Sequence, residues 1–158
     1  MSSEKLKKVS IVCSKGSLEG IYPALIMANG ARMEGIEVDV FFTFFGMDAI
    51  TKKKMKKIKV ATVGNPAMGI PTLVGSIPGM SAMATKMMKK QMDELDVPPV
   101  DEFLDMITAG GGEVYACKLA FDMFKLKKED LSEHVSDILT VGEFYEKASG
   151  EDAQIIFT

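Results

Sequence analysis

The stretch VSIVCSKGSLEGIYPALIMANGARMEGIEVDVFFTFF, residues 9–45, decides the fold. It opens on the β-branched apolar run Val9–Cys13, which predicts a buried strand. Apolar residues then recur at near-helical spacing over 18–33, and Gly35 stands where a helix would stop. The run Glu37–Phe45 predicts a second strand that ends in aromatic residues. Strand, helix and strand in this order predict a right-handed parallel unit.

Strand and helix signals alternate through the rest of the chain. Further strands are expected at 113–117, 137–140 and 154–157, and further helices at 47–51, 79–95, 100–108, 118–124 and 141–149. The pattern predicts an α/β fold, a doubly wound and mainly parallel sheet of about five strands with helices on both faces. Between the expected helices 47–51 and 79–95, glycine and proline come at close intervals, which predicts a long loop at about 60–78. Loops of that length are usually functional, covered by a partner or mobile.

Length and composition restrict the class of protein. The 158 residues match one domain, 1–158, and a net charge of −3 provides no basic footprint for nucleic acid. The two cysteines form no CxxC pair, so neither a disulfide framework nor a zinc or other metal site is expected. The first residues lead into only a short apolar run, which predicts no signal peptide. A reducing cytoplasm fits these features.

Cys117 is the candidate for covalent chemistry. It ends the expected strand 113–117 and stands at the start of the expected helix 118–124. Ligands of open α/β sheets gather at the carboxyl ends of the strands, and the free N–H groups of a helix start favour a thiolate. Cysteine is also among the most often buried residues and packs as a small hydrophobe. Position alone leaves both interpretations open.

The segment Glu113–Met123 resembles the active-cysteine segment of the DsrE/DsrF-like sulfurtransferase family, especially its archaeal and bacterial branch sometimes labelled peroxiredoxin-like. The resemblance covers nearly the whole chain. Four other segments resemble that branch in the same order: Ser14–Gly16, Phe41–Gly46, Ala84–Met88 and Val97–Pro99.

This resemblance implies a sulfur carrier or sulfurtransferase that forms a homo-oligomer. Cys117 would accept sulfane sulfur as a persulfide or thiosulfonate and pass it to an acceptor thiol, with no cofactor. The partners would be a sulfane-sulfur donor and an acceptor thiol, each a protein or a small molecule. The chain departs from the family at Ala120, Met123 and Phe124, where a serine and a Met-Gly pair are common. The pocket beside the thiol is therefore expected to be more apolar, and the substrate to differ with it.

Three further residues are candidates for the site. Lys15, on the loop after the first strand, and Lys118, beside the cysteine, would hold an anionic donor such as thiosulfate, although solvated surface lysine is the plainer interpretation. Cys13 is a candidate second thiol, with a core position as the alternative. His134 is the only histidine and lies in a polar segment, so a surface role is expected for it.

A rival hypothesis comes from a different class of function. The chain would be a non-enzymatic binding or assembly module with an inert Cys117, which uses the apolar loop and the Met-rich helix 79–95 for a partner. Contact with a membrane surface is a less favoured use of the same segment. The lysine run at 52–57 is expected to be solvated surface.

Overall fold

The structure is a computed structural model that describes residues 5–150 and 152–158. Residues 1–4, on which the expectation of no signal peptide partly depends, lie outside the described residues. Over the described part, one parallel sheet has the strand order β4-β3-β2-β1-β5. Its strands are β1 (Lys8–Cys13), β2 (Glu37–Phe42), β3 (Glu113–Cys117), β4 (Asp137–Leu139) and β5 (Ala153–Phe157). The expected parallel sheet is confirmed.

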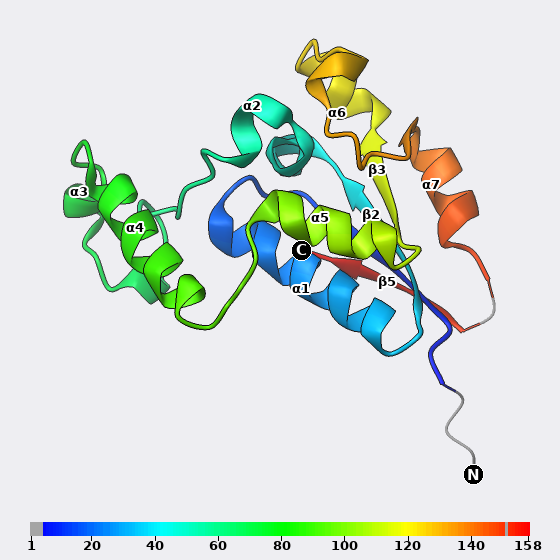
Figure 1. Ribbon diagram of the computed structural model, residues 1–158. Coiled ribbons are helices and arrows are strands. Elements are labelled where there is room, and N and C mark those ends of the chain that lie inside the picture. The colour runs from blue at the N-terminus through cyan, green and yellow to red at the C-terminus, as the bar shows by residue number, and fades with distance from the viewer. Residues whose placement is uncertain (1–4, 151) are drawn as a thin grey trace.

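Helices cover both faces of this sheet. The elements between strands are α1 (Leu18–Met33), η1 (Phe44–Ile50), α2 (Lys52–Met55), η2 (Pro66–Met68), α3 (Thr72–Gly75), α4 (Met80–Asp93), α5 (Val100–Ala109), α6 (Lys118–Met123), η3 (Lys128–Asp130) and α7 (Val141–Ala148). Helices α1 and α5 pack together on one face, and α7 packs on the other (Figure 1). The chain after β4 passes through α7 to the far edge of the sheet, where β5 pairs with β1. This crossing makes the sheet doubly wound.

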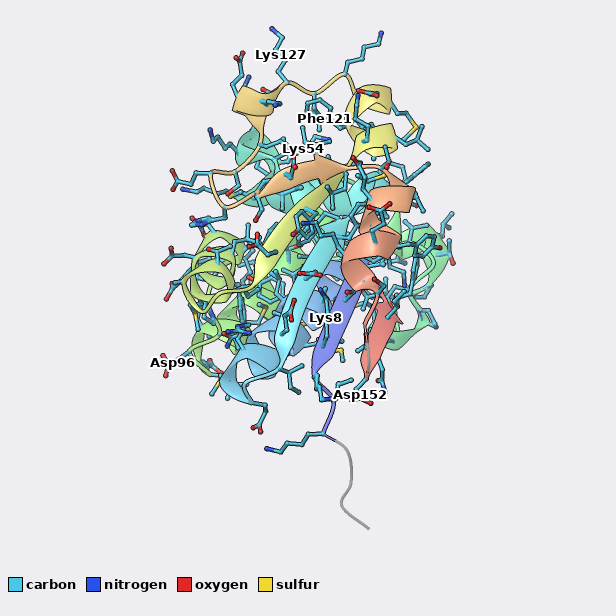
Figure 2. The ribbon with its side chains drawn as sticks, turned by 90° about the vertical axis from the view of Figure 1, so that its right-hand side faces the viewer. Lys8, Lys54, Asp96, Phe121, Lys127 and Asp152 are labelled. Atoms are coloured by element: carbon cyan, nitrogen blue, oxygen red, sulfur yellow. The ribbon has the colours of Figure 1, made fainter. Side chains whose placement is uncertain are left out.

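Alternation along the strands determines which side chains face α7. Phe41 stacks on Phe144 of α7 with ring centroids 4.5 Å apart, and Phe42 is fully buried on the opposite face, toward α1. Lys8 and Asp39 lie on the α7 face, where Lys8 Nζ is 3.0 Å from a carboxylate oxygen of Asp39. Figure 2 views the molecule from this side and shows Lys8 on the sheet. Burial raises the pKa of the Asp39 carboxyl.

The second strand ends earlier than the expected Glu37–Phe45. The backbone of Phe44 explains the difference, because its φ of 49° is a value that an extended strand does not allow. The chain turns there into η1, and the N–H of Gly46 donates to the carbonyl of Ser14 at 3.1 Å. The aromatic residues at the end of this run therefore lie on a folded loop beside the first strand, not in the sheet.

Helices α3 and α4 stand out from the sheet and its covering helices (Figure 1). The preceding segment is mostly irregular and contains only the short elements η2 and α3. Within α4 the buried residues are Ala84 and Thr85, while Met83 and Met87 are 55% and 62% exposed. None of the helices in the described part of the chain has the length and apolar character needed to cross a bilayer.

Candidate functional site at the carboxyl ends of the strands

The ends of β1, β2 and β3 lie side by side at one edge of the sheet. Cys13 pairs with Phe42, and Phe42 pairs with Ala116, so the residues that follow these three strands meet at the same edge. The loops there are packed tightly, since a Cβ on Gly16 would approach the main-chain oxygen of Phe45 to 2.6 Å. In parallel α/β sheets this edge is where ligands bind.

Cys117 stands at the junction between β3 and α6. It pairs with Leu139 of β4 and serves as the N-cap residue of α6, without a hydrogen bond from its side chain to the helix. Its φ of −71° and ψ of 121° are extended values, so the strand continues up to the residue where the helix begins. The residue is only 3% exposed. A donor therefore reaches the thiol only if the covering residues shift.

Apolar side chains lie on the two segments near this junction, the loop after β2 and α6. The rings of Phe44, Phe45 and Phe124 form a cluster with centroids 5.2 to 6.3 Å apart, which joins the loop after β2 to the end of α6. On α6, Leu119 is 70% exposed and Ala120 is buried. The more apolar pocket beside the thiol that Ala120 and Phe124 suggest stays a prediction. The aromatic cluster itself was not predicted, because nothing in the sequence shows that the residues after β2 turn toward α6.

Cys13 is placed away from Cys117. Strand β2 lies between their strands, which at the usual spacing puts the two Cα atoms about 10 Å apart. The two side chains also point to opposite faces of the sheet. Cys13 Sγ lies 3.8 Å from the carbonyl oxygen of Gly20 in α1. Cys117 comes two residues after Tyr115 in β3, so it points to the same face as Tyr115 and its register partner Phe41, which is the face that α7 covers. Disulfides need Cα separations below about 7 Å. The structure therefore does not bring the two thiols together, and both are free.

Burial raises the pKa of the Cys13 thiol to about 11. Because the thiolate is the reactive form, we expect Cys13 in a Cys117→Ser variant to react with iodoacetamide at pH 8 at least ~100-fold more slowly than free cysteine. The rate should keep rising with pH up to the raised pKa. Mass spectrometry of timed samples measures the reaction, and the same variant in denaturant is the control. Fast labelling of the folded variant would contradict the buried position of Cys13.

The two candidate lysines differ in their surroundings. Lys118 Nζ lies 2.6 Å from both carboxylate oxygens of Asp122 on its own helix, so its charge is already paired. Lys15 is exposed on the loop after β1 and has no ion pair within the described residues. Both lysines follow strands that flank β2, at the same edge of the sheet as Cys117.

Three lysines other than Lys15 and Lys118 line a cavity near the edge of the sheet that holds Cys117. It has a volume of about 290 Å³ and runs from Gly16 and Ser17 to Lys54, Lys57 and Lys59. Lys54 also lies 5.7 Å above the ring of Phe124, which links this region to the end of α6. The lysines at 52–57 are exposed, as expected, and two of them, Lys54 and Lys57, also line this cavity. In the sequence, the lysine run was the only sign of this cavity, and a run of charges does not show which face of the protein its side chains occupy.

Comparison with known proteins supports a family assignment. Residues 5–156 match the model of the family described as DsrE/DsrF/DrsH-like. The chain belongs to this family. A resemblance to the DsrE/DsrF-like family was expected from the segment around Cys117 and four others along the chain, and the match over residues 5–156 confirms it.

Two relatives of this DsrE/DsrF/DrsH-like chain are similar over most of their length. The sulfur carrier protein DsrE2 of Allochromatium vinosum is 33% identical in an alignment of 154 residues that covers 92% of this chain and 95% of the relative. The uncharacterized protein YrkE of Bacillus subtilis is 25% identical in an alignment of 143 residues that covers 84% of this chain and 86% of the relative.

Solved structures agree with the fold. The protein MTH1491 from Methanobacterium thermoautotrophicum superposes with a TM-score of 0.59 at 12% identity, covering 96% of this chain and 99% of that one. The ychN protein from E. coli has a TM-score of 0.57 at 16% identity, with the same coverage. At these identities the likeness concerns the fold alone.

Proposed function

We propose that this chain is a sulfur carrier that accepts sulfane sulfur on Cys117 and passes it to an acceptor thiol. The observation that carries the proposal is the 33% identity, over 92% of the chain, to a protein named as a sulfur carrier. The position of Cys117 supports it, because this cysteine ends a strand at the ligand-binding edge of a parallel sheet. Cys13 also ends a strand at this edge, but its side chain is buried beneath the long helix α1.

The chemistry is thiol exchange in two steps. The Cys117 thiolate attacks the outer sulfur of a persulfide donor R–S–SH, a new S–S bond forms, and the donor leaves as the thiolate R–S⁻. An acceptor thiolate then attacks the outer sulfur of Cys117–S–SH, which releases the Cys117 thiolate again. With tetrathionate, attack on a sulfane sulfur releases thiosulfate and leaves a thiosulfonate on Cys117. Neither route needs a metal or a nucleotide.

Access to the thiol is part of the proposal. Cys117 is 3% exposed, and the short helix α6 starts directly after it. A displacement of α6 would let the donor reach the thiol. In the loaded protein, the outer sulfur would lie about 2 Å beyond the Cys117 sulfur and so nearer the surface. Lys15 and Lys118 are the proposed contacts for an anionic donor; Lys118 would have to exchange Asp122 for the donor.

The partners and setting follow from the same proposal. Donor and acceptor are proteins or small thiols, and a reducing cytoplasm keeps Cys117 available for loading. We also propose that the chain forms a homo-oligomer. Exposed apolar side chains on the edge strand β5 and on α7 support this, with Phe157 71%, Tyr145 59% and Ile155 50% exposed.

The test is to load the protein with sulfur. We expect the reduced protein, incubated with polysulfide or tetrathionate and then desalted, to carry a single adduct that dithiothreitol removes. Intact-mass spectrometry shows the added sulfur or thiosulfonate directly. If the folded protein gains no reversible adduct from either donor, Cys117 is not a sulfur-carrying residue and the proposal fails.

A non-enzymatic binding module is the second candidate function, favoured by the burial of Cys117 and by exposed apolar residues elsewhere. Cys117 is nearly buried, while the protruding segment from η2 to α4 exposes Leu73, Ile77 and Met87 at 85%, 53% and 62%. The loading experiment separates the two functions. A module with an inert Cys117 would take up no sulfur and would resist alkylation at that residue until it unfolds.

A further inference from the structure

A second surface lies beside α4, away from the cysteine. A groove of about 790 Å³ runs between α4 and the residues that follow α2. We call it the lysine groove, after the lysines that line it: Lys56, Lys57, Lys59, Lys86, Lys89 and Lys90. Among the described residues, Asp93 is the one carboxylate in its lining. A chain with a net charge of −3 therefore concentrates positive charge at this place.

Most of this charge has no partner within the protein. Among residues 5–150 and 152–158, Lys56 alone of the groove lysines has an ion pair, with Asp101 at 3.9 Å. On α4, Lys86, Lys89 and Lys90 are all exposed and stand on neighbouring turns. Like charges this close repel one another, and screening by salt only weakens the repulsion. An anionic occupant would remove it.

Two of the groove lysines extend toward the edge of the sheet that holds Cys117, into a cavity whose lining also contains Asp48, paired with Lys54 at 2.8 Å. Lys57 and Lys59 also line the 290 Å³ cavity that reaches Gly16 and Ser17 at the start of α1. The N–H of Leu18 donates to the carbonyl of Lys59 at 2.9 Å, which ties this segment to α1. The two cavities, of about 290 and 790 Å³, offer more space than a small anion needs and leave room for a segment of a protein chain.

The groove also has an apolar component. Ile58 and Ala82 are part of its lining, and Met83 and Met87, which are not part of it, each follow a lining residue of α4 and are exposed. Methionine packs adaptably against the side chains of a bound partner. The occupant that satisfies both components has carboxylates and apolar residues on one segment. We propose that the lysine groove binds an acidic amphipathic segment of a partner protein.

Other anionic occupants fit less well. Proteins that bind single-stranded nucleic acid combine a positive groove with aromatic rings on which bases stack, and the lining contains no aromatic ring among the residues that the structure describes. A membrane surface is broad and cannot enter a concave groove between two elements. The proposal concerns a docking surface and not the thiol, so it stands or falls separately from sulfur loading on Cys117.

The test uses a fluorescein-labelled synthetic peptide with leucines and glutamates at helical spacing, and the same peptide with glutamine in place of glutamate. We expect the wild-type protein to bind the glutamate peptide, with an affinity that falls as salt is added, and to bind the glutamine peptide much more weakly. In the variant Lys86→Glu/Lys89→Glu/Lys90→Glu the affinity should fall at least ~10-fold. These lysines are exposed, so the variant should fold, and circular dichroism checks that it does.

The matched control is Lys125→Glu/Lys127→Glu/Lys128→Glu, which changes the net charge by the same amount outside the groove. It should weaken peptide binding by less than ~2-fold. If both variants lost the same amount of peptide affinity, the effect would come from net charge alone and the proposal would be overturned. Tighter binding of a single-stranded oligonucleotide or of phosphatidylserine vesicles than of the peptide would overturn it too. Salt-sensitive self-association that disappears only in the α4 variant would assign the groove to a second copy instead, which also overturns it.

Discussion

A Cys117→Ser variant is expected to take up no sulfur from polysulfide or tetrathionate, whereas a Cys13→Ser variant loads as the wild-type protein does. Serine keeps the size of the side chain but is not a nucleophile toward sulfane sulfur under these conditions, so the loss should be complete. Intact-mass spectrometry of both variants, before and after dithiothreitol, measures it.

The two cysteines are a matched pair for this comparison. Both end strands of the same sheet and both are buried, at 0% and 3% exposure for Cys13 and Cys117. They differ in which face they occupy and in what covers them: Cys13 lies against the long helix α1, and Cys117 lies at the start of the short helix α6. An adduct that persists in Cys117→Ser and disappears in Cys13→Ser would move the reactive thiol to Cys13 and overturn the assignment.

The second large effect is expected from Gly46→Ala, which should lower the free energy of unfolding by at least ~3 kcal/mol. A Cβ at this position would overlap the main-chain carbonyl of Cys13 and would lie 2.8 Å from its carbon. Main chain cannot move aside as a flexible side chain does. The loop after β2 would have to separate from the end of β1, with loss of the bond from Gly46 N–H to Ser14. Urea denaturation followed by circular dichroism measures the change.

Gly30→Ala is the control for this prediction. Gly30 lies inside α1, its φ is not positive, and a Cβ there meets nothing within 4 Å. Alanine should therefore stabilise the protein, by about 0.5–1 kcal/mol, because it restricts the unfolded chain and favours the helix. If Gly46→Ala unfolds at the same urea concentration as the wild-type protein, the loop after β2 is not packed against the end of β1 as described.

Local signals were sufficient for most of the elements, and they failed where a contact between distant segments decides the conformation. The run of aromatic residues after Glu37 has strand character throughout, so sequence alone extended β2 to Phe45. The strand stops at Phe42 because Gly46 bonds to Ser14 of the neighbouring strand end and Phe44 takes a positive φ. Neither the partner nor the turn is visible in the residues themselves.

The lysine and methionine runs show the same limit. The lysines at 52–57 and the methionines along 79–95 were visible in the sequence, but the sequence did not show which of these side chains pack in the core and which lie on the surface. Packing decides it: Met88 and Met92 contact the core, while Met83 and Met87 are exposed on α4. The lysine groove joins residues about 30 positions apart, which no local pattern predicts.

The sequence by itself determined the parallel α/β architecture and the position of Cys117 at a strand-to-helix junction. It could do so because hydrophobic period, turn residues and the segment around the cysteine are all local. Only the tertiary structure decided how the two cysteines relate. The pairing order places β2 between β1 and β3, and the register turns Cys13 toward α1 and Cys117 toward the face of α7. Strand order and register depend on how whole elements pack, and that information is spread over the entire chain.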